Sequence, residues 1–118
     1  MDEEELRQRR VALRLEVVEG LLWAIENADT VLALSQAAPS RDAAVQGLHE
    51  RHGLTEFVAH HVMDVTFGQV TEHAVERLRN EAIRLRRGED TSTPRSDLDE
   101  QLDPFTIELR DDDGPGTA

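Results

Sequence analysis

The spacing of apolar residues restricts most of the first 88 residues of this chain to helices. Two apolar stripes run side by side at helical spacing between residues 15 and 31, one made of Leu15, Val18, Leu22 and Ile25 and the other of Val17, Leu21, Ala24, Ala28 and Val31. A helix with two adjacent stripes is apolar around much of its circumference, so other elements must cover it. The pattern predicts one long helix that is buried from Leu15 onward.

Small polar residues mark the starts of three further helices. Serine and threonine cap helices because their hydroxyl groups accept hydrogen bonds from backbone N–H groups of the first turn. The expected caps are Ser40, Thr55 and Thr71, ahead of helices over residues 41–52, 56–67 and 72–87. Gly53 suits the left-handed backbone that ends many helices, and the last helix is expected to end at Gly88. The chain is therefore predicted to be all-α, with Ala44, Val45, Leu48 and His52 facing inward from the helix over residues 41–52.

The two ends of this helical region have only narrow apolar seams. The first helix begins with Leu6, Val11 and Leu13 among charged residues, and the last helix has an a/d-like seam of Val75, Leu78, Ala82 and Leu85. Because a narrow seam covers a single partner helix, we expect the two segments to pair as an antiparallel coiled-coil stem that carries a small helical head. Residues 1–88 would form the stem and head, and residues 89–118 a separate, largely disordered acidic tail.

Charge divides the chain at the same point. The net charge is −12, and residues 89–118 hold ten acidic residues against two arginines, so they contribute −8 of it. All 13 basic residues are arginines, and the two stem segments contain Arg7, Arg9, Arg10, Arg14, Arg77, Arg79, Arg84, Arg86 and Arg87. Such runs are usually solvated helix faces, although here they form a basic zone that could touch DNA weakly. We expect the acids of the tail to lie near this stem as mobile counter-charge.

One part of the tail is less polar than the rest. The segment DPFTIELR alternates apolar and polar residues, as a short strand does. Three interpretations are open for it. It is residual hydrophobicity in a linker, a short docking motif, or a strap that places Phe105, Ile107 and Leu109 on the head.

No catalytic, metal or cofactor site is predicted. The sequence has no cysteine, which excludes disulfides, thiol nucleophiles and cysteine-ligated zinc. His60 and His61 are helix neighbours that point about 100° apart, and the pair His49 and His52 lacks a third ligand. Asp64 is either a buried acid or, more simply, a structural hydrogen-bonding acid. No stretch reaches the roughly 18 apolar residues that a membrane helix needs, so a soluble, cytoplasmic protein is expected.

Two blocks of the sequence have the spacing of a known protein family. The segment VVEGLLWAIENADTVLAL is similar to the pattern ILEGLxxALxxIDxVIxLI, and LTEFVAHHVMDVTFGQVT is similar to LTExQAQAILDMRLxxLT. These patterns belong to the region that ends the coiled-coil arms of the A subunits of bacterial DNA gyrase and topoisomerase IV, which this chain resembles from about Leu15 to Leu85. Thr66 and Phe67 replace the arginine and leucine of the second pattern, so this part of the surface has diverged.

The resemblance implies a helical head on two arm helices, with the heads of two subunits meeting to close the enzyme's exit gate for DNA. The dimer interface it implies contains Phe57, His60, His61, Asp64, Val65, Phe67 and Gly68. Topoisomerases of this type cleave DNA with a tyrosine nucleophile, and the sequence has no tyrosine. A non-enzymatic module that forms homodimers is therefore expected.

Two functions from different classes remain open at the level of sequence. In the first, the protein modulates a type II topoisomerase by pairing with a gyrase or topoisomerase IV A subunit. In the second, it is a self-contained homodimer whose arginine-rich stem touches DNA, or whose acidic tail acts as a DNA mimic. A gene remnant without a retained role is a third interpretation.

Overall fold

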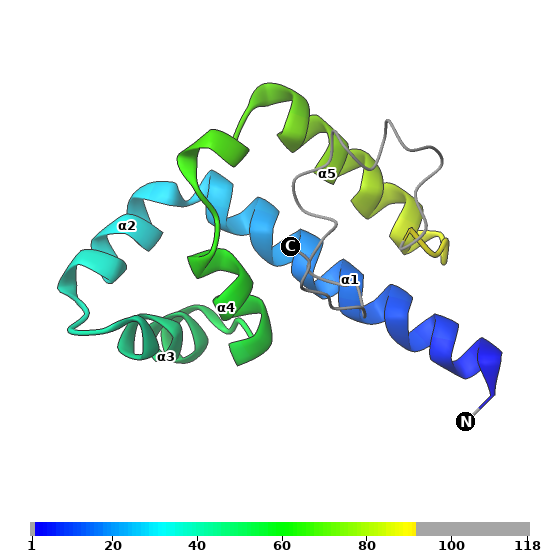
Figure 1. Cartoon of the computed structure of the whole chain (residues 1–118), viewed down its shortest axis with the longest axis horizontal. Helices are drawn as coiled ribbons and strands as arrows, with labels where there is room; N and C mark the ends of the chain where they lie inside the picture. Colours follow the sequence, from blue (N-terminus) through cyan, green and yellow to red (C-terminus); the bar gives the residue numbers. More distant parts are fainter. Residues whose placement is uncertain (1, 92–118) are drawn as a thin grey trace, which may run out of the picture.

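The computed structural model describes residues 2–91, and over that range the chain forms five α-helices, one 3₁₀ helix and no strand (Figure 1). The elements are α1 (Glu3–Glu26), α2 (Ala28–Ala37), α3 (Arg41–His52), α4 (Glu56–Met63), η1 (Phe67–Gln69) and α5 (Glu72–Arg86). The predicted all-α fold is confirmed. No helix in the described part of the chain is both long and apolar enough to cross a membrane.

The predicted helix starts and ends are confirmed at most positions. The hydroxyl groups of Ser40, Thr55 and Thr71 accept hydrogen bonds from the third residue of the helix that each precedes, over 3.1 to 3.2 Å. Gly53 and Gly88 have positive φ angles of 75° and 87° just beyond α3 and α5. The start of α1 was not predicted: Asp2 and Glu5 form a capping box in which each side chain accepts from the other residue's backbone N–H.

The predicted single first helix is wrong, because Asn27 breaks it. Asn27 has φ −118° and ψ 38°, which is not helical, and α2 begins at the next residue. The amide side chain of Asn27 donates a 2.9 Å hydrogen bond to the carbonyl oxygen of Trp23. Asparagine favours such local side-chain bonds over helix continuation, and the result is an elbow between α1 and α2 (Figure 1).

The predicted helix over residues 56–67 is also too long, since α4 ends at Met63 and Asp64 is its C-terminal cap. The chain then turns into η1, which Thr66 and Gln69 cap reciprocally. The Gln69 side chain accepts a 2.8 Å hydrogen bond from the backbone N–H of Thr66. This local capping box stabilises a new N-terminus at the position where the predicted helix would have continued.

The first half of α1 packs antiparallel against α5 and forms the stem (Figure 1). Two cross-stem contacts mark the pairing, from Arg7 to the carbonyl oxygen of Gly88 and from Arg14 to Glu81. The apolar residues buried in the stem are Val11, Val18, Ala74, Leu78, Ala82 and Leu85. The predicted antiparallel stem is therefore present. Of the seam predicted for the first helix only Val11 is buried, whereas Leu6 and Leu13 are exposed, so that part of the prediction is wrong.

The head consists of α2, α3 and α4 gathered around the second half of α1. Its buried apolar residues are Val17, Leu21, Leu34, Ala44, Val45, Leu48, Val58, Ala59 and Val62. Gly20 lies where α1 crosses α4, and a Cβ atom there would collide with the side chain of Val58. His52 was expected to face inward, but it is exposed and its ring lies 5.0 Å from the ring of half-buried Trp23. Trp23 thus packs at the edge of the core.

Candidate interaction surfaces

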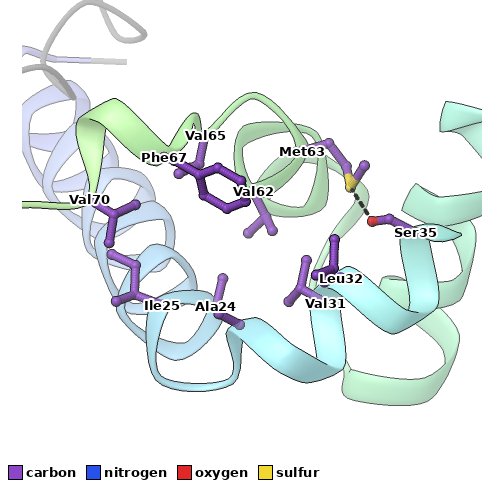
Figure 2. A pocket seen from close by; sticks show the side chains of 11 residues that line it. Ala24, Ile25, Val31, Leu32, Ser35, Val62, Met63, Val65, Phe67 and Val70 are labelled. Atoms are coloured by element: carbon purple, nitrogen blue, oxygen red, sulfur yellow. Dashed lines mark hydrogen bonds between the residues drawn. The ribbon is translucent and has the colours of Figure 1, made fainter.

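An apolar groove lies between the α1–α2 elbow and the chain that follows α4, and we call it the head groove (Figure 2). It encloses about 250 Å³. Its lining consists of Ala24, Ile25, Ala28, Val31, Leu32, Ser35, Val62, Met63, Val65, Phe67 and Val70. None of these side chains carries a charge, and the hydroxyl group of Ser35 lies 3.7 Å from the Met63 sulfur. The groove can therefore hold an apolar group but offers little to a polar ligand.

The two breaks in the predicted helices create this groove. The elbow at Asn27 turns α2 away from the axis of α1, so that Val31 and Leu32 face the side of the gap opposite Val65 (Figure 2). Because α4 stops at Met63, the following segment crosses over the gap without filling it.

Phe67 is the most exposed large apolar residue in the described part of the chain. It is 89% exposed, although it lines the head groove at its rim (Figure 2). Leu32, on the opposite wall, is 49% exposed. Scattered exposed apolar residues are ordinary on protein surfaces, whereas a contiguous apolar patch with a hollow in it marks an interaction site.

The outer face of α4 adjoins this patch and carries four of the predicted interface residues. Phe57 is 42% exposed, and its ring meets the ring of His61 edge-on at 4.6 Å. Arg41 of α3 donates to the carbonyl oxygen of His60 at 3.1 Å and forms a 2.9 Å ion pair with Asp64. Asp64 is exposed, so the alternative of a buried acid is wrong and the structural role holds: it ties α3 to the end of α4.

The residues predicted for the dimer interface therefore fall into two neighbouring places. Phe57, His60, His61 and Asp64 lie on the outer face of α4, while Val65 and Phe67 line the head groove and Gly68 is exposed beside them. Sequence reasoning missed the opposite wall of the groove, which α1 and α2 supply. The signal was available in Val31 and Leu32, which continue an apolar stripe past a residue that disfavours helix.

Carboxylates of the chain itself engage many of the stem arginines. The ion pairs are Arg7 with Glu4 at 3.0 Å, Arg10 with Asp90 at 2.8 Å, Arg14 with Glu81 at 2.7 Å, Arg84 with Glu89 at 3.0 Å and Arg86 with Glu19 at 3.0 Å. Arg9, Arg79 and Arg87 are exposed and form no ion pair within residues 2–91. Arg77 is half-buried.

Arg14 does not belong to an exposed basic zone, which corrects the sequence interpretation. Its guanidinium group is buried between α1 and α5 and binds both carboxylate oxygens of Glu81, at 2.7 and 2.9 Å. The hydroxyl group of Thr91 donates to the same carboxylate. A guanidinium group that is buried and held in this way cannot reach a phosphate. The partner lies 67 residues away in sequence, and no local pattern identifies it.

The first residues of the predicted acidic tail lie against the stem. Glu89 binds Arg84 and Asp90 binds Arg10, while Thr91 reaches the buried Glu81. The expected counter-charge is thus confirmed for Glu89 and Asp90. The rest of the tail, including the segment with Phe105, Ile107 and Leu109, lies outside the described residues.

The ion pair at the start of α1 shifts the ionisation of both partners. A hydrogen bond from Arg7, a second from Gln8 and the positive charge of Arg7 lower the pKa of Glu4. The hydrogen bond to Glu4 and the negative charge of Glu4 raise the pKa of Arg7. Both side chains are open to solvent, Arg7 partly and Glu4 more so, and solvent therefore screens the attraction.

Two of the histidines, His49 and His52, make local contacts at the end of α3. The Nδ1 atom of His49 lies 2.7 Å from the carbonyl oxygen of Leu54, and His52 packs against Trp23. Within residues 2–91, no group of three or more histidine, aspartate or glutamate side chains is arranged to hold a metal ion.

Two curated relatives show what the chain is similar to. It is 33% identical over 73 residues to the A subunit of DNA gyrase from Mycoplasma pneumoniae, and the match covers 62% of this chain. It is 32% identical over 81 residues to the A subunit of DNA gyrase from Campylobacter jejuni, and that match covers 69% of this chain. In both cases the match spans 9% of the length of the relative. No protein-family model matches the chain.

Proposed function

We propose that this chain is a non-catalytic pairing module, in which the head groove and the outer face of α4 join two heads. The observation that carries the proposal is the open, uncharged head groove with Phe67 exposed at its rim. Apolar surface of this kind is costly to leave in water, and a second protein surface removes the cost.

The head is a better pairing site than the stem, because the charges of the stem are largely paired within the chain and the head has an open apolar groove. In the stem, charged side chains bind one another across α1 and α5 or bind the segment after α5. Both regions have exposed large apolar residues, but in the head Leu32 and Phe67 lie around an apolar groove. The similarity to the gyrase A subunit supports a role connected with a type II topoisomerase. The module would act there by pairing of subunits, without cleaving DNA itself.

The mass of the purified chain in solution tests the pairing directly. Light scattering at micromolar concentration should give the mass of a dimer for the native chain. The variant Phe67→Ser removes the exposed ring and should shift the mass toward that of a monomer. A matched control is Phe57→Ser on the neighbouring face, which should weaken pairing less. A monomeric native chain would contradict the proposal.

Capture of a topoisomerase subunit tests the wider role. Immobilised native chain should retain the purified A subunit of gyrase, and the Phe67→Ser variant should retain less of it, because both heads would use the same surface. A homodimer that ignores the gyrase protein would limit the function to self-association.

The stem supports a second candidate, contact with DNA, through a smaller set of residues than the sequence indicated. Arg9, Arg79 and Arg87 are exposed and carry no ion pair within residues 2–91. The affinity for DNA falls more steeply with rising salt for each phosphate that an arginine neutralises. Fluorescence anisotropy with duplex DNA should therefore show weak affinity that falls with salt and is lost on replacing the three arginines by glutamine. Affinity that is equal in the native chain and this variant would remove the candidate.

A further inference from the structure

The head groove and Phe67 together form a surface that carries both a protruding ring and a hollow. Phe67 projects from η1 with 89% of its surface exposed, and the hollow beside it is lined by apolar side chains such as Val31, Val62 and Val70 (Figure 2). The ring lines the rim without entering the hollow, since a ring seated in its own groove would be largely buried. The chain therefore leaves its own hollow unfilled.

The size and chemistry of the hollow fit an aromatic ring. Apolar cavities of about 150 Å³ accept benzene, and the head groove encloses about 250 Å³. Burial of a phenyl side chain removes on the order of 200 Å² of apolar surface from water. No lining side chain carries a charge that such a ring would desolvate.

A second copy of this chain is the occupant that these observations favour. In a two-fold symmetric pair the same patch meets itself, so a patch that holds a ring and a matching hollow is self-complementary. The chain also has a net charge of −12, which makes two copies repel. An uncharged patch is the place where two copies can approach with the least repulsion.

We propose that Phe67 of each copy inserts into the head groove of the other copy. This inference rests on the proposed function and names the contact that determines it. Two identical ring-in-groove contacts related by the two-fold axis hold the pair, and the outer faces of α4 flank them. A partner chain can then fill the head groove only if it presents an apolar ring as Phe67 does.

Two variants separate the ring from the hollow. Phe67→Ser removes the ring and keeps the other ten side chains that line the hollow, and Ala28→Phe fills the hollow and keeps the ring. Both positions are exposed, so each variant should fold, with circular dichroism and melting temperature as the checks. Loss of a central aromatic contact should raise the Kd of self-association at least about 30-fold in each variant, measured by analytical ultracentrifugation. Phe67→Leu, which keeps an apolar side chain, should raise it less.

Mixing the two variants gives the decisive result. The ring of an Ala28→Phe copy fits the hollow of a Phe67→Ser copy, so the mixed pair recovers one of the two contacts. Its Kd should lie at least about tenfold below that of either variant alone, as native mass spectrometry of differently sized tags would show. A mixed pair no tighter than the variants overturns the proposal, as does a Phe67→Ser dimer with native Kd. If Ala28→Phe does not fold, the Kd of Phe67→Ser and Phe67→Leu decides alone.

The other occupants are outcomes of the same measurements. Replacing Phe105 and Ile107 by serine in the full chain should leave the Kd unchanged. If this change alters pairing and Phe67→Ser does not, the chain's own tail fills the groove and the proposal is wrong. A native chain that is monomeric throughout contradicts the proposed function itself, whereas a native dimer indifferent to Phe67 contradicts only this contact.

Discussion

The stem and the head bury their helices with different chemistry. At the centre of the stem, α1 and α5 enclose the ion pair of Arg14 and Glu81 within an apolar seam. In the head, the residues buried between α1, α3 and α4 are apolar, with Gly20 allowing close approach to Val58, and the ion pair of Arg41 and Asp64 lies at the surface. The charged groups of the stem are largely paired within the chain, although Leu6, Leu13 and Ile83 are exposed, while the short helices of the head leave an apolar hollow. Small helical units with too little core commonly complete their burial with a partner.

The stem and the head therefore contribute differently: the ion pair of the stem fixes how α1 and α5 align, and the apolar surface of the head supplies stability. A buried ion pair adds little net stability compared with apolar side chains of the same size, but it penalises any other alignment of the two helices. Apolar burial gives more stability and less direction. We therefore expect changes in the stem to act on folding and alignment, and changes at the head groove to act on association.

The largest effect should come from breaking the buried ion pair. Arg14→Met leaves the Glu81 carboxylate buried without its cation, which should lower the free energy of unfolding by about 3–5 kcal/mol in urea denaturation. The double variant Arg14→Met, Glu81→Leu should recover most of this loss. Arg10→Met is the matched control, because Arg10 is exposed. Equal losses for Arg14→Met and Arg10→Met would remove the distinction drawn for the stem.

An intermediate effect is expected where α1 crosses α4. Gly20→Ala places a methyl group against the Val58 side chain, and overpacking of this kind costs about 1–3 kcal/mol. The better helix propensity of alanine offsets up to about 1 kcal/mol of that. Combining it with Val58→Ala should cost less than the sum of the two single changes, measured as a double-mutant cycle. Additive losses would show that the two residues do not share the crossing point.

A smaller effect should follow from releasing the segment after α5. Asp90→Asn removes the ion pair with Arg10, in which Arg10 is exposed and Asp90 is partly covered. A surface pair is worth about 0–1 kcal/mol and weakens as salt rises. Thermal melting at low and high salt should show a loss at low salt only. Glu76→Gln, an exposed change on α5, is the control and should show no such dependence. The same loss at both salt concentrations would mean that Asp90 acts through something other than charge.

The smallest effect concerns the first turn of α1. The hydrogen bond from Arg7 holds the pKa of Glu4 below its ordinary value of 4.5. A lowered pKa contributes stability above the ordinary value and loses it as the pH falls through the folded value. Glu4→Gln should therefore melt slightly lower than the native chain at pH 7, and the two should converge in acid. If the melting temperatures of Glu4→Gln and the native chain still differ at low pH, the effect comes from packing and not from the charge of Glu4.

Local chemistry made much of the fold predictable. Ser40, Thr55 and Thr71 cap helices because a hydroxyl group in that position satisfies a backbone N–H whatever the rest of the chain does. Gly53 ends α3 for an equally local reason. The stem was predictable too, since two narrow seams require each other. These features depend on short stretches of sequence or on one complementary pair of stretches.

The remaining features depend on competition and on distant partners. Apolar periodicity continues past Asn27, so the side-chain hydrogen bond to Trp23 that breaks the helix is visible only in three dimensions. The burial of Arg14 depends on Glu81, which no motif links to it. The head groove was predicted only on one side, where Val65 and Phe67 lie. Val31 and Leu32 were visible as apolar residues, but they form the other wall only because α2 turns away after Asn27.

The hydrogen bond from Arg7 to the carbonyl oxygen of Gly88 has a mechanical consequence. It brings the start of α1 and the end of α5 together at the end of the stem away from the head (Figure 1). The two helices of the stem are thus joined near this end as well as at the pair of Arg14 and Glu81, so a displacement of the start of α1 would pull on the end of α5.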